Sequence, residues 1–124
     1  MKPRRSHPPT LRGQVWVEAG KGVAMSDAGA DLLEQIAVCG SLSEAARRLG
    51  FSYRRAWMLV DGMNRRWQAP LVVTATGGER GGGTRVTEFG EVVLRSYRDI
   101  QFQLEHLLDR ATKAFLKATR SPAD

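Results

Sequence analysis

Residues 40–57 read GSLSEAARRLGFSYRRAW, and this run carries the signals of two short helices separated by a turn. Ser41 and Ser52 each stand before a helical pattern, where serine is a preferred N-cap. Gly50 favours a tight turn between the helices, and the small side chain of Ala46 lets them approach closely. A helix, a glycine turn and a second helix form the layout of a helix-turn-helix unit, whose second helix enters the major groove of DNA.

The second helix has an apolar stripe and a basic face. At about 100° per residue, we expect the core stripe, which includes two tryptophans, to contain Ala56, Trp57, Val60, Met63 and Trp67. The opposite face, on which Asp61 is the only acid, contains Arg54, Arg55, Met58, Gly62, Arg65 and Arg66. Arginines suit phosphate and guanine contacts, although an ordinary solvated helix face can have the same composition. The coincidence of cap, turn, small residue and basic face favours DNA binding.

Shorter signals precede this unit. The segment 11–18 contains a β-leaning run at 15–17, and the turn 19–22 leads into a second run at 23–25. Ser26 is expected to cap a helix that ends at Gly40. Cys39, at the end of that helix, is expected to be a small buried residue. One face of the helix is expected to hold Leu32, Leu33, Ile36 and Ala37.

Residues 71–86 predict a β-hairpin with a glycine-rich loop. The run LVVT at 71–74 favours a strand, TGGERGGG follows at 76–83, and TRV at 84–86 predicts a second strand. The loop has the outer glycine spacing of a phosphate-binding P-loop, but the lysine is missing and a strand follows in place of a helix. A hairpin after a helix-turn-helix is a wing, whose tip can lie along a minor groove with Arg80 and Arg85 facing phosphates.

From Thr87 to about Lys117, apolar residues recur at spacings of three and four, which predicts one long helix. Thirty helical residues span about 45 Å, whereas a compact domain of this length is roughly 35 Å across. The end of a straight helix would project and leave an apolar seam, so we expect a homodimer. The monomeric alternative is a bent helix that folds back on its own domain. The expected interface consists of Ile100, Leu104, Leu107, Leu108, Ala111 and Phe115.

Composition narrows the class of protein. The 124 residues suit one domain, and 19 Lys and Arg against 13 Asp and Glu give a formal net charge of +6, which favours polyanionic partners. No apolar run approaches the roughly 20 residues that span a bilayer, and a signal peptide is not evident, so we expect a cytoplasmic protein without membrane contact. A single cysteine excludes an internal disulfide. With two histidines and no catalytic arrangement of residues, we expect no metal, no cofactor and no enzyme activity.

Several motifs of the chain recur together in one known family. They are GSLSEAA at 40–46, GFSYRRAW at 50–57, MN at 63–64, TGG at 76–78 and GGG at 81–83, with Leu71, Thr87 and Gly90. Over about residues 11–117, the chain resembles the N-terminal DNA-binding domain of ModE-type molybdate-responsive transcriptional regulators. That domain is itself similar to the winged helix of LysR-type regulators.

The resemblance implies a mainly α fold with small β-hairpins, namely a winged helix-turn-helix with a long C-terminal dimerisation helix. We expect a flexible basic arm (1–10), the winged helix-turn-helix (11–86), the dimerisation helix (87–117) and a flexible tail (118–124). Residues 52–55 fall at the start of the family's recognition helix, and 76–85 fall on its wing. The expected DNA-binding residues are Ser43, Ser52, Tyr53, Arg54, Arg55, Met58, Arg65, Arg66, Thr76, Arg80, Thr84 and Arg85.

The resemblance thus implies a sequence-specific transcriptional regulator that binds double-stranded DNA at a two-fold operator, with molybdenum-related genes as candidate targets. The alternative is a winged-helix protein-interaction module that binds another regulator or a sensor. Full-length family members carry C-terminal oxyanion-binding modules, and this chain stops where they would begin. We therefore expect that this chain alone does not bind molybdate.

Overall fold

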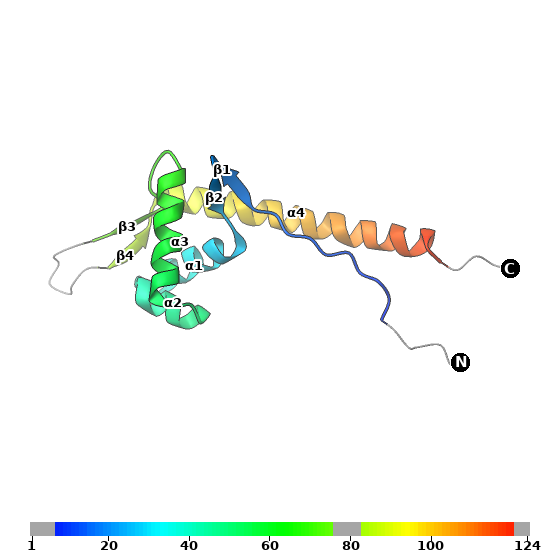
Figure 1. Ribbon diagram of the computed structural model, residues 1–124, viewed down its shortest axis with the longest axis horizontal. Coiled ribbons are helices and arrows are strands. Elements are labelled where there is room, and N and C mark those ends of the chain that lie inside the picture. The colour runs from blue at the N-terminus through cyan, green and yellow to red at the C-terminus, as the bar shows by residue number, and fades with distance from the viewer. Residues whose placement is uncertain (1–6, 76–82, 121–124) are drawn as a thin grey trace.

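The computed structural model describes residues 7–75 and 83–120, which form a winged-helix body with one long helix extending from it (Figure 1). The described elements follow the order β1 (Val17–Ala19), β2 (Gly22–Met25), α1 (Asp27–Cys39), α2 (Leu42–Leu49), α3 (Tyr53–Arg66), β3 (Val72–Thr74), β4 (Thr84–Val86) and α4 (Glu88–Ala118). The strands form two separate antiparallel hairpins, β1–β2 and β3–β4. The fold is mainly α with two small hairpins, as predicted. Of the expected flexible ends, residues 1–6 and 121–124 lie outside the described part.

Polar caps begin the helices where the sequence predicts them. The side-chain oxygens of Ser26, Ser41 and Ser52 accept hydrogen bonds from backbone N–H groups three residues further on, at 3.0–3.1 Å. Gly40 and Gly50 end α1 and α2 in the left-handed conformation, with φ angles of 66° and 71°. A side chain is strained in this conformation, so glycine permits the sharp turns that join α1, α2 and α3.

The core lies between α1, α2, α3 and the first turns of α4. Its fully buried side chains include Leu32, Leu33, Ile36, Ala45, Ala56, Leu71 and Tyr97. Two expectations for α1 were wrong. Ala37 is exposed although Leu33, one turn earlier on the same side of the helix, is buried, so the core does not cover this side of the last turn of α1. Cys39 is half-buried at the helix end, where its thiol donates a hydrogen bond to the carbonyl of Ser41 at 3.4 Å.

The hairpin β3–β4 is anchored to the helices through both of its strands. The Asn64 side chain of α3 accepts hydrogen bonds from the backbone N–H groups of Leu71 (2.8 Å) and Val72 (3.2 Å) and donates one to the carbonyl of Val72 (2.9 Å). On the other strand, the backbone N–H of Thr84 donates to the carbonyl of Gly40 at 3.0 Å. These bonds hold the wing against the helix-turn-helix.

The start of α4 packs closely on the backbone at Leu71. The Thr87 hydroxyl accepts a hydrogen bond from the N–H of Gly90 at 2.9 Å and donates to the carbonyl of Pro70 at 2.8 Å. A Cβ atom at Gly90 would lie 2.3 Å from the carbonyl oxygen of Leu71, well inside contact distance. Glycine at position 90 therefore permits the close approach that sets the direction of α4.

The C-terminal part of α4 extends away from the body, with residues 11–16 running beside it (Figure 1). The Tyr97 hydroxyl donates to the carbonyl of Val15 at 2.7 Å, and the N–H of Leu11 donates to the Thr112 hydroxyl at 3.0 Å. Burial raises the pKa of Tyr97, which keeps this hydroxyl protonated as a donor. The sequence did not reveal this packing, because an extended segment with few apolar residues has no periodic pattern.

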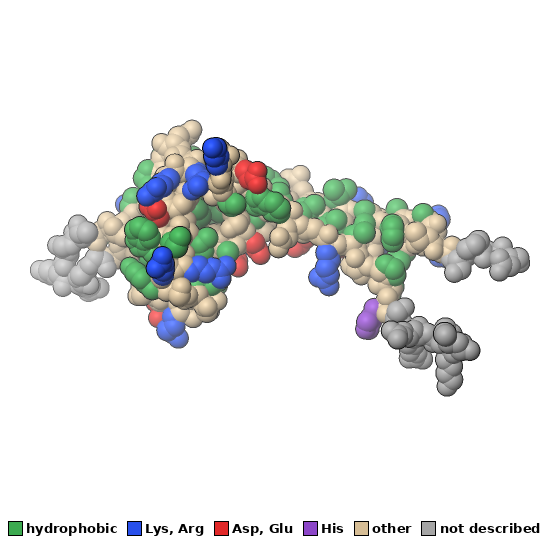
Figure 2. Space-filling model, in the orientation of Figure 1, with side chains coloured by type: hydrophobic (Ala, Val, Ile, Leu, Met, Phe, Trp, Pro, Cys, Tyr) green, Lys and Arg blue, Asp and Glu red, His purple; other side chains and the backbone are tan. Residues whose placement is uncertain are grey.

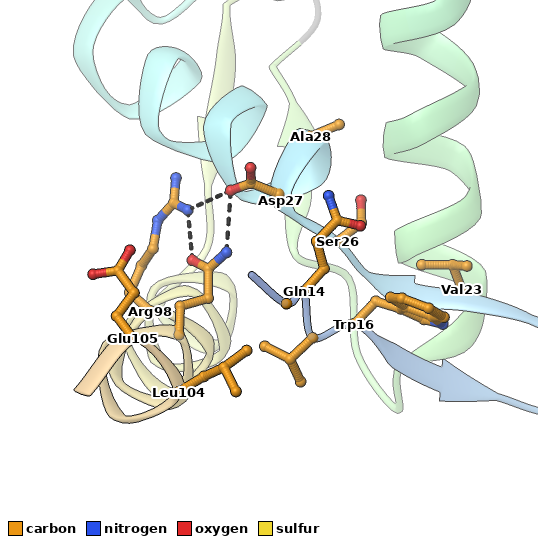
Figure 3. Close-up of a pocket in the computed structure, with 12 residues that line it drawn as sticks. Gln14, Trp16, Val23, Ser26, Asp27, Ala28, Arg98, Leu104 and Glu105 are labelled. Atoms are coloured by element: carbon orange, nitrogen blue, oxygen red, sulfur yellow. Dashed lines mark hydrogen bonds and ion pairs between the residues drawn. The ribbon is translucent and has the colours of Figure 1, made fainter. Parts of the chain in front are cut away.

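An ion cluster joins α4 to α1. The Arg98 guanidinium contacts the carboxylates of Asp27 (3.0 Å), Asp31 (2.7 Å) and Glu34 (2.6 Å). The Gln101 amide also donates to Asp27 at 3.1 Å, and the bonds from Gln101 and Arg98 lower the pKa of Asp27. Figure 3 shows the side chains of Asp27, at the start of α1, and Arg98, on α4, facing each other. The cluster fixes α4 against the first turns of α1.

We expect the Arg98 cluster to make the protein acid-sensitive. Because folding lowers the pKa of Asp27, its stabilising contribution is present above the ordinary value of 3.8 and is lost as the pH falls through the lowered value. The half-exposed carboxylates limit the cluster to about 1 kcal/mol. Arg98→Met should lower the thermal midpoint near neutral pH, and its deficit relative to the unmodified protein should shrink at about pH 3. The control is Arg95→Met, which removes an exposed pair with Glu91. A deficit that is independent of pH would contradict this account.

Asn64 should contribute strongly to stability although it is not a core residue. Asn64→Leu leaves two backbone N–H groups and one carbonyl of the strand start without their partner. The expected loss in free energy of unfolding is about 1–3 kcal/mol. Urea denaturation measures it, with Gln68→Leu as the control because Gln68 is an exposed amide four residues further on. Equal stabilities of the two variants would show that the Asn64 bonds do not hold the wing.

Candidate nucleic-acid interface

The helix α3 lies on an open face of the body. Figure 2 shows lysine and arginine side chains gathered with hydrophobic ones on the face where α3 runs. The predicted basic residues of α3 are all exposed, namely Arg54, Arg55, Arg65 and Arg66, and so is Met58. Their exposure agrees with the predicted opposition between a core stripe and a basic face.

The four arginines differ in what they contact. Among the described residues, Arg54 and Arg55 have no carboxylate partner, and the Arg55 guanidinium lies 4.0 Å from the centroid of the Phe51 ring. Arg65 forms an ion pair with Asp61 at 3.0 Å. Arg66 donates to the carbonyl of Gly62 at 3.2 Å, with its guanidinium against Gly22 of β2. The charges at the N-terminal end of α3 are therefore the ones most available to a partner.

Two serine hydroxyl groups lie at the start of α2. Ser43 is exposed, and its hydroxyl lies 3.2 Å from that of Ser41. Glu44 pairs with Arg47 and Arg48, and the bond from Arg47 chiefly lowers the pKa of Glu44 to about 2. The acid thus stays ionised and offsets part of the positive charge of α2.

The wing contributes one exposed basic residue within the described part. Arg85 is exposed on β4, and Thr84 is half-buried beside Gly40. The other expected wing residues, Thr76 and Arg80, lie outside the described residues.

The expected position of Trp57 was wrong. We predicted this side chain for the core, yet 51% of its surface is exposed. Ala56 and Met63, seven residues apart, share the buried face, and Trp57 lies about 100° beyond Ala56. Tyr53, expected among the DNA-binding residues, is exposed on the same helix. The exposed face of α3 is consequently apolar as well as basic.

The expected dimer residues divide into two groups on α4. Ile100, Leu107 and Phe115 are exposed, whereas Leu104, Leu108 and Ala111 are half-buried. The side chain of Leu108 lies against Gly13, so the segment 11–16 covers one flank of the seam. On the other flank, an apolar groove of about 500 Å³ is lined in part by Val15, Ile100, Leu104 and Leu107.

A second cleft of about 530 Å³ lies between residues 13–16, the start of α1 and α4 (Figure 3). Val15, Trp16 and Leu104 form its apolar side, and the Asp27–Arg98 pair forms its polar side. Three carboxylates surround the single guanidinium of Arg98. This negative region is unsuited to a phosphate backbone, which leaves α3 as the better candidate for DNA contact.

No helix in the described residues is long and apolar enough to cross a membrane. Within 7–75 and 83–120, no group of three or more His, Cys, Asp and Glu side chains is placed to hold a metal ion.

Comparison with known proteins connects this architecture to a family. The family described as "Bacterial regulatory helix-turn-helix protein, lysR family" matches residues 29–91, which run from the first turn of α1 through β4 to the start of α4. Over 98 residues the chain is 38% identical to the molybdenum transport protein ModE of Azotobacter vinelandii, covering 79% of this chain and 36% of that protein. It is 39% identical over 74 residues to the DNA-binding transcriptional dual regulator ModE of Escherichia coli K12, covering 60% and 28% of the two chains.

A further curated relative and one solved structure also align with this chain. The chain is 39% identical over 93 residues to the molybdenum-pterin-binding protein MopB of Rhodobacter capsulatus, covering 75% of this chain and 34% of that one. The crystal structure of ArgP from Mycobacterium tuberculosis aligns at a TM-score of 0.48 with 20% identity, over 67% of this chain and 29% of its own. The chain spans about a third of the length of these curated relatives. It belongs to the LysR family of bacterial regulatory helix-turn-helix proteins, and its winged helix-turn-helix is of the ModE type.

Proposed function

We propose that this protein is a sequence-specific DNA-binding transcriptional regulator that acts as a dimer on a two-fold operator in the cytoplasm and performs no catalysis. The observation that carries the proposal is the N-terminal end of α3, where Arg54 and Arg55 are exposed and have no carboxylate partner among the described residues. In a helix-turn-helix protein, this end of the second helix lies nearest to the base edges. The names of the ModE relatives support molybdenum-related genes as targets.

The contacts would divide between bases and phosphates. Arg54 and Arg55 suit bidentate contact with guanine, and the wing residue Arg85 suits the backbone. Ser43 and Ser52, at the starts of α2 and α3, can donate to phosphates. Arg65 lies about three turns further along α3 and is already paired with Asp61, which favours a phosphate-facing role.

A dimer would form through α4. The helix has 31 residues and is therefore about 46 Å long, with exposed Ile100, Leu107 and Phe115 on its projecting part. Fully burying each large apolar side chain contributes roughly 1.5–3 kcal/mol, and two-fold symmetry repeats every contact. Such a seam can offset the entropy of association. The two recognition helices of such a dimer would suit half-sites about 34–36 Å apart. That molybdate does not bind this chain alone stays a prediction.

Selection of bound sequences from random DNA tests the proposal. We expect a two-fold consensus sequence. We also expect the logarithm of the binding constant to fall linearly with the logarithm of the salt concentration, with a slope of about −0.9 for each neutralised phosphate. Arg54→Ala or Arg55→Ala should cost about 1–3 kcal/mol and relax the preference at one base pair of each half-site. Arg65→Ala should weaken all sequences alike. No enriched sequence and no salt dependence would favour the protein-interaction module, for which the exposed α4 seam is the supporting observation.

Charge in the α4 seam should separate the subunits. The double variant Ile100→Glu, Leu107→Glu should be a folded monomer at micromolar concentration and should bind the selected site at least about tenfold more weakly. The matched control is Val92→Glu, because Val92 is a 48% exposed apolar residue near the start of α4, before its projecting part. Light scattering measures the mass, and circular dichroism checks folding. A monomeric unmodified protein that still binds the two-fold site tightly would refute the dimer.

A further inference from the structure

The exposed face of α3 includes an apolar group with no role in the core. The exposed fractions are 58% for Tyr53, 51% for Trp57 and 56% for Met58, all within the first two turns of the helix. Exposed apolar side chains gathered on one element of a soluble protein mark a contact site. These three lie among the residues that, under the proposed function, approach the bases.

We propose that Tyr53, Trp57 and Met58 recognise thymine through its 5-methyl group in the major groove, with Trp57 as a specificity-determining residue. The inference rests on the proposed function, since it requires α3 to enter the groove. It assigns to Trp57 a role that the basic residues of the helix cannot perform.

The angular positions place apolar and basic groups on one continuous surface. Met58 follows the buried Ala56 by two residues, and Arg54 precedes it by two. Each is therefore rotated about 200° from Ala56 around the helix axis, so both side chains point away from the core. Trp57 and Arg55 lie about 100° from Ala56 on opposite flanks. A duplex that meets the outward face of α3 would therefore touch an apolar flank and a basic flank at once.

The polar group of Trp57 is also unused. Within the described residues, its indole N–H has no hydrogen-bond acceptor, whereas Trp67 donates to the carbonyl of Ala24 at 2.7 Å and Trp16 to the Glu18 carboxylate at 2.9 Å. Trp57 thus combines an open ring face with a free donor. Tryptophan is suited to a surface that is apolar at one point and polar at the next.

The chemistry of the groove identifies the occupant. On the major-groove edge of the base pairs, the thymine methyl is the apolar group, and the other positions are hydrogen-bond donors or acceptors. An apolar protein partner would have to bury the flanking charges of Arg54 and Arg55, whereas in the proposed DNA complex these charges contact guanine within a polyanionic duplex. Charge complementarity therefore favours DNA, and contact with the methyl distinguishes thymine from cytosine, adenine and guanine.

Replacing thymine by uracil tests the proposal without changing the protein. The selected operator is synthesised with uracil in place of thymine at one symmetric pair of positions at a time, which removes only the methyl group. We expect at least one such pair at which affinity falls roughly fourfold per methyl group, measured by fluorescence anisotropy at fixed salt. Positions outside the α3 contact should show no change.

Variants of the protein then assign the contact to a residue. At one of the positions where uracil weakens binding of the unmodified protein, Trp57→Ala should bind the thymine and uracil operators with equal affinity. Met58→Ala should lose the discrimination at the same position or at a neighbouring one. Trp16→Ala is the matched control, because Trp16 has an exposed fraction of 50% and lies outside α3. It should keep the discrimination of the unmodified protein. Circular dichroism confirms that each variant is folded.

The outcomes separate this inference from the proposed function. If no sequence is enriched from random DNA, the proposed function fails and the inference fails with it. If an operator is found and the unmodified protein binds its thymine and uracil forms equally at every position, only the inference is overturned. Discrimination that survives in both Trp57→Ala and Met58→Ala would likewise overturn it.

Discussion

Contact between α2 and α3 through small side chains is the constraint on which the candidate interface depends. Ala45 and Ala46 of α2 and Ala56 of α3 belong to one buried core cluster and are 0%, 2% and 0% exposed, and such small side chains let neighbouring helices pack closely. A rotation of α3 about its axis would replace Ala56 in this contact by Trp57 or Arg55, neither of which fits the space of a methyl group. The rotation of α3 is therefore fixed, and with it the set of side chains that faces outward.

The backbone at Leu71 connects the helix-turn-helix to the other two parts of the molecule. Its N–H bonds to Asn64 of α3, and its carbonyl accepts from the N–H of Thr87 at 2.9 Å, next to the place where Gly90 packs. The orientations of α3, the wing and α4 are consequently set within a few residues of one point. In a dimer built on α4, the distance between recognition helices would depend on this junction.

The charges of the chain serve two different purposes. Arg98 is held by three carboxylates of α1, so its charge contributes to the joint between α1 and α4 and is largely neutralised there. Arg54 and Arg55 have no such partners among the described residues. The charge of Arg98 is thus used within the fold, whereas the charges of Arg54 and Arg55 at the start of α3 are open to a polyanionic partner.

Local rules determined much of this protein from its sequence. Serine caps, glycine turns, the β3–β4 hairpin and the apolar repeat of α4 depend on residues within a few positions of one another, so the order of helices and hairpins could be predicted, and the arginines of α3 were placed on the exposed face. Only the tertiary structure decided the rest. Trp57 lies at the edge of a stripe whose width is set by how much of α3 its neighbours cover. The bonds of Tyr97 to Val15 and of Arg98 to Glu34 join residues 82 and 64 positions apart, and no local pattern records which distant side chains the packing brings together.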